Sequence, residues 1–216
     1  MALGMALGMA LWNKRGIVLS ADVKGTFPCR EFNSEDTFQE LELGKDIYKY
    51  YIYNDKYVII HPGIIEGNPI GIDIFEEEYP SLYLPDMVVK FASFLEKSVL
   101  PNRKYDFFIA GYVKNDQFVY HIEVSDRGVT ITCKLNSDAD FMLAGCGDIA
   151  KNILYTTFDV VDLFDMTVNE MITVSKNVYF MGSQIQDDLR CIKTVGKECN
   201  VISITPEGLN YQFFEK

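Results

Sequence analysis

The sequence predicts an α+β fold in which antiparallel strands and helices are grouped separately along the chain. Strands come in pairs or triplets joined by short polar turns, and they do not alternate singly with helices as a doubly wound parallel sheet requires. The 216 residues are 48% hydrophobic and 24% charged, which are globular proportions. Because no internal linker rich in Gly, Pro or Ser divides the chain, we expect one domain over residues 1–216.

The first predicted element is a β-hairpin. An apolar run reaches Trp12, a polar turn covers Asn13 to Gly16, and a second apolar run from Ile17 ends at Asp22. Residues 26–44 are polar, and we expect irregular structure there.

A second hairpin and a helix follow. Runs rich in Tyr, Ile and Val at 47–53 and 57–60, parted by the turn 54–56, predict the hairpin. Pro85 suits the first position of a helix, and apolar residues then recur at helical spacing up to residue 99. The pattern therefore predicts a helix over 85–99.

The second half of the chain predicts a meander, two helices and a last hairpin. Three strands are expected at 107–112, 118–124 and 129–135. One helix starts after the Gly145-Cys146-Gly147-Asp148 loop, and the capping box Thr167-Val168-Asn169-Glu170 starts the next. The closing hairpin is expected at 201–205 and 209–214.

The charge balance bears on possible partners. Asp and Glu number 31 against 20 Lys and Arg, which gives a formal net charge of −11. Since no Lys/Arg cluster offsets this charge, we expect neither nucleic acid nor an anionic membrane as the main partner.

Cysteine content and the first residues bear on the compartment. Five cysteines with no C-x-x-C pair predict neither a zinc site nor a disulfide framework, which favours a reducing, cytoplasmic location. The first twelve residues are apolar or small, but they are too few to span a bilayer and lack the basic start of a signal peptide. We therefore expect neither a membrane segment nor a leader.

Few residues offer familiar site chemistry. Both histidines, His61 and His121, are expected to be structural or solvent-facing, with a general-base role as the alternative. The pair Gly145 and Gly147 lacks the third glycine of a dinucleotide fingerprint. The acidic groups at 76–78 and at 138 and 140 lack calcium-loop spacing. No cofactor and no metal are expected.

A constellation of weak motifs spans the chain. An apolar strand and tight turn lead into Gly16 to Asp22, Lys45 comes later, the Gly145 loop opens a helix, and a stretch from Gly196 to Gly208 closes the chain. In this order the motifs resemble the proteasome-like family of N-terminal-nucleophile (Ntn) hydrolases over nearly the full length. The resemblance implies a four-layer αββα sandwich of two antiparallel sheets between helical layers. It also implies an ancestral reaction of peptide or amide bond hydrolysis and assembly into homo- or hetero-oligomers.

The resemblance also implies roles for individual residues. In that family the first residue of the mature chain, usually Thr, attacks a carbonyl while its free α-amine, which titrates near 8, acts as base. Asp22 matches the family aspartate, Lys45 resembles the active-site lysine, and Cys146 replaces the first serine of a Gly-Ser-Gly-Ser segment. Without the resemblance, Asp22 would be a turn cap, Lys45 a surface charge and Cys146 a small residue at a helix start.

Two departures from the family pattern stand out. Counting back from Asp22 by the family spacing places the nucleophile at Ala6, and no Thr, Ser or Cys precedes Ser20. Residues 192–196 also lack the Asp-x-x-Ser that active proteasome subunits carry before a glycine. If the alignment holds, Asp22 and Lys45 should approach within about 4 Å near Ala6, with Cys146 lining the same cleft.

The sequence leaves three functions open. The first is a proteasome-like hydrolase-fold protein disabled by its missing nucleophile, with Ser20 or Cys146 as the replacement nucleophile should activity be found. The second is a non-catalytic ring or scaffold subunit, self-associating through helices such as 85–99. The third is a ligand-binding domain that uses the cleft between the sheets.

Overall fold

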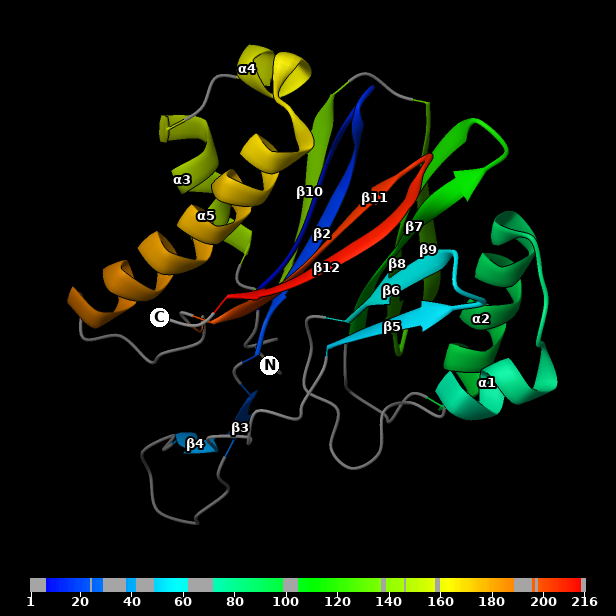
Figure 1. The fold of residues 1–216 in the computed structure, drawn as a ribbon. Helices are drawn as coiled ribbons and strands as arrows, with labels where there is room; N and C mark the ends of the chain where they lie inside the picture. The colour runs from blue at the N-terminus through cyan, green and yellow to red at the C-terminus, as the bar shows by residue number, and fades with distance from the viewer. Residues whose placement is uncertain are drawn as a thin grey trace.

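The computed structural model describes residues 7–23, 25–28, 38–41, 49–61, 72–98, 105–136, 139–145, 147–157, 160–188, 196 and 198–214. Two five-stranded antiparallel sheets dominate these residues, and helices lie on their outer faces (Figure 1). The α+β class and the antiparallel pairing predicted from the sequence are therefore confirmed.

The first sheet has the strand order β10-β1-β2-β11-β12, so its two ends come from the middle and the end of the chain. Its strands are β1 (Leu7–Asn13), β2 (Gly16–Asp22), β10 (Asp140–Gly145), β11 (Cys199–Thr205) and β12 (Gly208–Phe214). Every residue of β1 and β2 is buried, because both faces of these strands are covered. This burial explains why both strands are unbroken apolar runs rather than alternating ones.

The second sheet has the order β5-β6-β7-β8-β9, in which each strand pairs with its neighbour in sequence. Its strands are β5 (Tyr50–Tyr53), β6 (Tyr57–Ile60), β7 (Tyr105–Val113), β8 (Asp116–Ser125) and β9 (Gly128–Leu135). The hairpin and the meander expected from the sequence are confirmed, and the meander strands are slightly longer than predicted.

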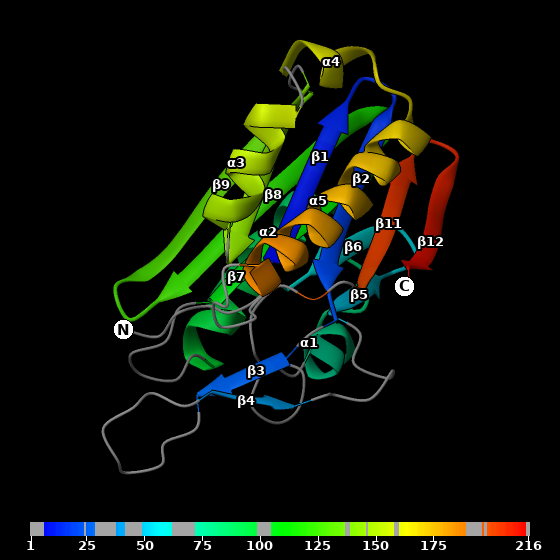
Figure 2. The same ribbon diagram turned by 90° about the vertical axis from the view of Figure 1, so that its left-hand side faces the viewer.

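Helices cover the outer face of each sheet (Figure 1). One group is α3 (Gly147–Thr157), α4 (Val160–Asp165) and α5 (Val168–Asp188), and the other is α1 (Ile72–Glu78) and α2 (Leu84–Ser98). Figure 2 shows α3 and α5 in front of the first sheet. The arrangement is compatible with a sandwich of sheets between helices.

Three apolar clusters fill the spaces between these layers. Side chains such as Trp12, Leu19 and Phe108 meet between the two sheets. A second cluster lies between the first sheet and α5, and a third, rich in Phe and Tyr, lies between the second sheet and α2. Successive residues of β2 thus alternate between two cores, as the two-residue period of a strand requires.

Several elements differ from the sequence prediction. Residues 26–44 are not wholly irregular, because β3 (Gly25–Pro28) and β4 (Phe38–Leu41) form a separate two-stranded sheet (Figure 2). The acidic run at 76–78 ends α1, which the sequence reasoning missed because only Ile72 and Phe75 of that helix are buried. It also missed α4 and the edge strand β10, which are only six residues long.

The turn between β1 and β2 is tied to the helices at one end of the sheet. Buried Asn13 donates from Nδ2 to the carbonyl oxygens of Leu163 and Met166, both at 2.8 Å. The predicted capping box is confirmed there too, since Thr167 N lies 2.6 Å from Glu170 Oε2 and Glu170 N lies 3.3 Å from Thr167 Oγ1. These bonds fix the turn, so the opposite ends of β1 and β2 are placed by a rigid hairpin.

Candidate functional site

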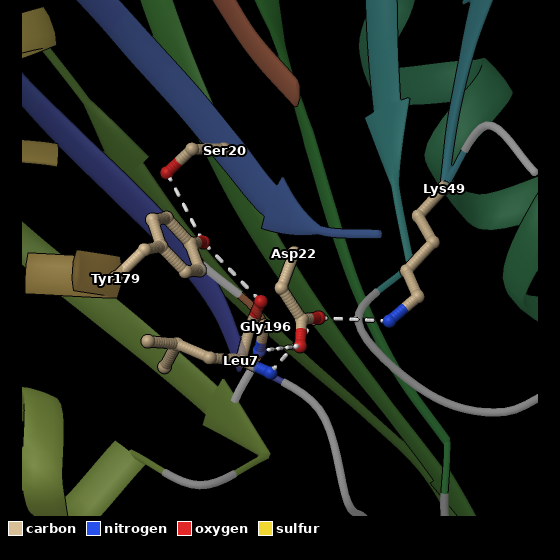
Figure 3. Close-up of polar contacts among 6 residues, drawn as sticks. All are labelled: Leu7, Ser20, Asp22, Lys49, Tyr179 and Gly196. Carbon is tan, nitrogen blue, oxygen red and sulfur yellow. Dashed lines mark hydrogen bonds and ion pairs between the residues drawn. The ribbon is translucent and has the colours of Figure 1, made fainter. Parts of the chain in front are cut away.

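The strongest concentration of buried polar groups lies at the end of β2 opposite that turn, around Asp22. The Asp22 side chain is fully buried and accepts three hydrogen bonds (Figure 3). Lys49 Nζ donates to Oδ1 at 2.8 Å, Gly196 N donates to Oδ2 at 3.0 Å, and Leu7 N lies 3.4 Å from Oδ1. One carboxylate therefore joins four distant segments of the chain.

The cation comes from the other sheet. Lys49 directly precedes β5, and its side chain is only 3% exposed. The Lys49 carbonyl oxygen accepts the backbone N–H of His61, the residue after β6, at 3.0 Å. The hairpin of β5 and β6 thus holds the base of the lysine while its ammonium group reaches across to Asp22.

Burial and hydrogen bonding act in opposite directions on Asp22. Loss of solvent raises the pKa of its carboxyl above the usual value of 3.8, and Lys49, Gly196 and Leu7 oppose that rise by stabilising the charged form. A buried ion pair also stabilises the fold less than its Coulomb attraction suggests, because both charges lose their hydration. The cost of this arrangement points to a role beyond stability.

A second polar network holds the same end of β1. Tyr179, on α5, donates its hydroxyl to the Leu7 carbonyl oxygen at 3.2 Å and is also hydrogen-bonded to Ser20 Oγ at 3.2 Å (Figure 3). Ser175 lies one turn earlier on α5 and donates to Ser20 Oγ at 2.6 Å. The backbone of Leu7 is thereby held on both sides, by Asp22 at its N–H and by Tyr179 at its carbonyl.

Burial also suppresses ionisation of the other groups near Asp22. The pKa of Tyr179 is raised well above its usual value, mainly by desolvation and further by the nearby Cys199 and Asp22. Desolvation and then Asp22 raise the pKa of the Cys199 thiol to about 12. Both groups are therefore neutral at physiological pH, and Lys176 opposes the rise in the pKa of Cys199 only weakly.

The sequence-predicted site residues have different outcomes. Asp22 ends β2, as the motif indicated. Lys45, Cys146 and Ala6 lie outside the described residues, so their predicted approach to Asp22 stays a prediction. Among the described residues, Lys49 is the lysine that contacts Asp22, and the sequence reasoning did not single it out.

A local signal could have found Lys49. It is the one charged residue in the run 47–53 that predicts a strand, and a charge among buried neighbours needs a partner of opposite sign. The family resemblance indicates Lys45 instead, in Gly44-Lys45-Asp46, and that position lies outside the described residues.

Ser20, a candidate replacement nucleophile, has a structural role. Its hydroxyl is fully buried between Ser175 and Tyr179 and faces α5 rather than the space between the sheets. No general base such as histidine is hydrogen-bonded to it, so nothing described around it activates it for attack.

The histidines lie on the second sheet or directly after it. His121 on β8 is 21% exposed and lies 2.8 Å from Asp106 Oδ1 through its Nε2, while His61 is buried. Within the described parts of the chain, no group of three or more His, Cys, Asp or Glu side chains is placed to hold a metal ion.

A hollow of about 310 Å³ lies at the far end of the sheets, beside the β1–β2 turn. Its walls include Lys14, Tyr112, Gln117 and Phe164. Since Lys14 and Asp22 lie at opposite ends of the hairpin, this hollow is separate from the Asp22 centre.

Comparison with known proteins adds no assignment. No protein-family model matches the chain, and no curated protein matches it. Among the described helices, none is both long and apolar enough to cross a membrane.

Proposed function

We propose that this chain is a proteasome-like Ntn-hydrolase-fold protein whose ancestral reaction is the hydrolysis of peptide or amide bonds, and that it lacks the attacking group. Two antiparallel sheets with helices on their outer faces are compatible with the four-layer sandwich of that family. The resemblance of the motifs along the sequence supports the same proposal.

The observation that carries the proposal is the contact between Asp22 and the start of β1. Asp22 accepts the N–H of Leu7 and is paired with Lys49, and Leu7 directly follows Ala6, the position at which the family spacing places the nucleophile. In this proposal Asp22 orients the backbone beside residue 6. Lys49 supplies a positive charge that would lower the pKa of a hydroxyl or amine placed there.

Alanine at position 6 offers a methyl group where an oxygen or sulfur would attack. No Thr, Ser or Cys precedes Ser20 in the sequence, and Ser20 is engaged in the network with α5. These two observations favour a second candidate function, a non-catalytic subunit of an oligomer that retains the charged centre for the geometry of its fold.

The test is to restore the missing group. The chain as given is assayed on fluorogenic peptides beside a shortened chain that begins at residue 6 with Ala6→Thr, released from an N-terminal fusion. We expect no turnover by the first. The second should hydrolyse the peptides and be modified by a covalent inhibitor directed at N-terminal nucleophiles.

Matched controls separate chemistry from folding. A shortened chain that keeps Ala6, and one that combines Ala6→Thr with Lys49→Met, should both stay inactive while retaining native circular dichroism. A folded Ala6→Thr chain that neither turns over substrate nor reacts with the inhibitor would contradict the hydrolase ancestry. Turnover by the unchanged chain would contradict the missing nucleophile.

A further inference from the structure

The β9 strand is an open edge of the second sheet. It pairs with β8 along its whole length, in continuous register from Gly128 to Leu135, and no strand among the described residues pairs with its other side. Figure 2 shows β9 at the outer margin of the molecule. An edge strand presents a row of N–H and C=O groups that can pair with another strand.

The side chains of β9 divide into an apolar stripe and a polar face. Val129, Ile131, Cys133 and Leu135 share the side of the sheet covered by α2, because their partners on β8 belong to that core. The helix covers them incompletely, since Ile131 is 40% exposed and Leu135 is 52% exposed. The opposite face carries Thr130 and Thr132, both exposed, and Lys134.

Several devices that usually protect an edge strand are missing from β9, although Lys134, which is paired with Asp140, places one charge on it. Its eight residues include no proline, its register with β8 has no bulge, and its single charge is Lys134 near one end. By comparison, β5, the opposite edge of the same sheet, has only four residues, and Glu76 of α1 is hydrogen-bonded to Tyr51 and to Asn54 N beside it.

We propose that β9 is a dimerisation edge at which a second copy of this chain adds its own β9 in antiparallel orientation. A two-fold axis through Thr132 pairs residues 129–135 of the two copies, so that Val129 lies opposite Leu135 of the second copy and Ile131 lies opposite Cys133. This register keeps both apolar stripes on one face and places Lys134 opposite Thr130. The five strands of each copy then form one continuous sheet.

Charge favours this edge for a second copy. The chain carries a net charge of −11, so two copies repel each other over most pairs of surfaces. β9 contains no acidic residue, and its one lysine does not meet its own copy in the register above. Pairing of two β9 strands therefore brings no carboxylates of the strand itself together at the place where the apolar stripe lies.

Light scattering over a concentration series tests the proposal. The native chain should approach twice 24.7 kDa as its concentration rises. Ile131→Lys, which places a charge in the centre of the stripe, should stay near 24.7 kDa at the same concentrations. Circular dichroism checks that this variant is folded, and Thr132→Lys, which sets two lysines opposite each other at the axis, provides a second test on the polar face.

Two control variants locate the interface. Tyr155→Lys on α3 (56% exposed) should leave the mass unchanged, as should Val89→Lys on α2 (58% exposed). A native chain that stays monomeric throughout would overturn the proposal and leave the edge to a different partner. A dimer that survives Ile131→Lys but is lost with Val89→Lys would place the interface on the helix instead.

Exposed Cys133 supplies a readout independent of mass. In the paired register the Cys133 thiol lies against Ile131 of the second copy, so its alkylation should slow as the fraction of dimer rises with protein concentration. The alkylation rate of Cys133 is obtained by subtracting the rate measured for Cys133→Ser from the rate measured for the native chain. A rate that does not change with concentration while the mass doubles would rule out pairing at β9.

Discussion

Removing one member of the Asp22–Lys49 pair should destabilise the protein more than removing both. Lys49→Met leaves the Asp22 carboxylate buried without its cation, and Asp22→Asn leaves the ammonium group of Lys49 at 3% exposure without its anion. Breaking a buried pair in this way costs about 3–5 kcal/mol, because the remaining charge has lost its water and gained no partner. The double variant leaves neither charge buried without a partner.

These energies are large enough to measure by melting. For a chain of this size each kcal/mol lowers Tm by roughly 2–4 °C, so either single variant should melt roughly 6–20 °C below the native chain. The only tryptophan, Trp12, is fully buried between the sheets, and its fluorescence reports unfolding in urea. We expect the double variant to be more stable than either single variant.

Acid should reduce the stability loss of both single variants relative to the native chain. The folded-state pKa of Asp22 is raised by burial, and Lys49→Met removes its strongest opposing influence, so the fold favours the protonated carboxyl still more. The loss of unfolding free energy caused by Lys49→Met is therefore greatest above the raised pKa of Asp22, and it shrinks as the pH falls through that pKa. In the native chain the Asp22 carboxyl is itself protonated over the same pH range and then matches asparagine in charge, so the loss of stability caused by Asp22→Asn should shrink in acid as well.

The double-mutant cycle also gives the result that would refute this reasoning. If the losses of unfolding free energy in the two single variants add up to the loss in the double variant within about 0.5 kcal/mol, Asp22 and Lys49 are not coupled. The ion pair would then have no energetic role, and the proposed centre would lose its main support.

Two further predictions concern a thiol and a helix cap. Burial raises the pKa of the Cys199 thiol to about 12, so iodoacetamide at pH 8 should alkylate exposed Cys133 and leave Cys199 unmodified until denaturant is added. Mass spectrometry of the treated native protein measures both modifications. Modification of Cys199 before denaturant is added would contradict its burial. Hydrogen bonds from Thr167 lower the pKa of Glu170, so its stabilising effect is present above the usual value of 4.5 and is lost as the pH falls. The Tm difference between the native chain and Glu170→Gln should accordingly vanish in acid, whereas the exposed control Glu96→Gln should show none at any pH.

Much of the fold could be predicted because the core strands carry their own signals. The apolar runs around Asn13 to Gly16 and the meander after Phe107 have turn residues at both ends, and the structure confirms them. Short edge elements lack such signals. β10 has a single fully buried residue, Ala144, and is placed by its pairing with β1, which is a long-range contact that no local pattern records.

The site was predictable only in part for the same reason. Asp22 could be located because it ends a strand whose boundaries are clear in the sequence. Its partners could not, since Lys49 and Gly196 reach it through the packing of the two sheets and the last hairpin. A motif fixes residue types in order along the chain, whereas an ion pair depends on which segments meet in space.

The three hydrogen bonds of Asp22 also set the order in which the molecule can be completed. They span 15, 27 and 174 residues of sequence, so the last contact closes a loop that contains most of the chain. Closing such a loop costs more chain entropy than forming a local hairpin, which places this step late in folding. During synthesis, the carboxylate of Asp22 therefore cannot accept the N–H of Gly196 until the chain has been made as far as that residue. Until then Oδ2 of Asp22 lacks its backbone donor, so the buried site around the ion pair is completed only after Gly196 is in place.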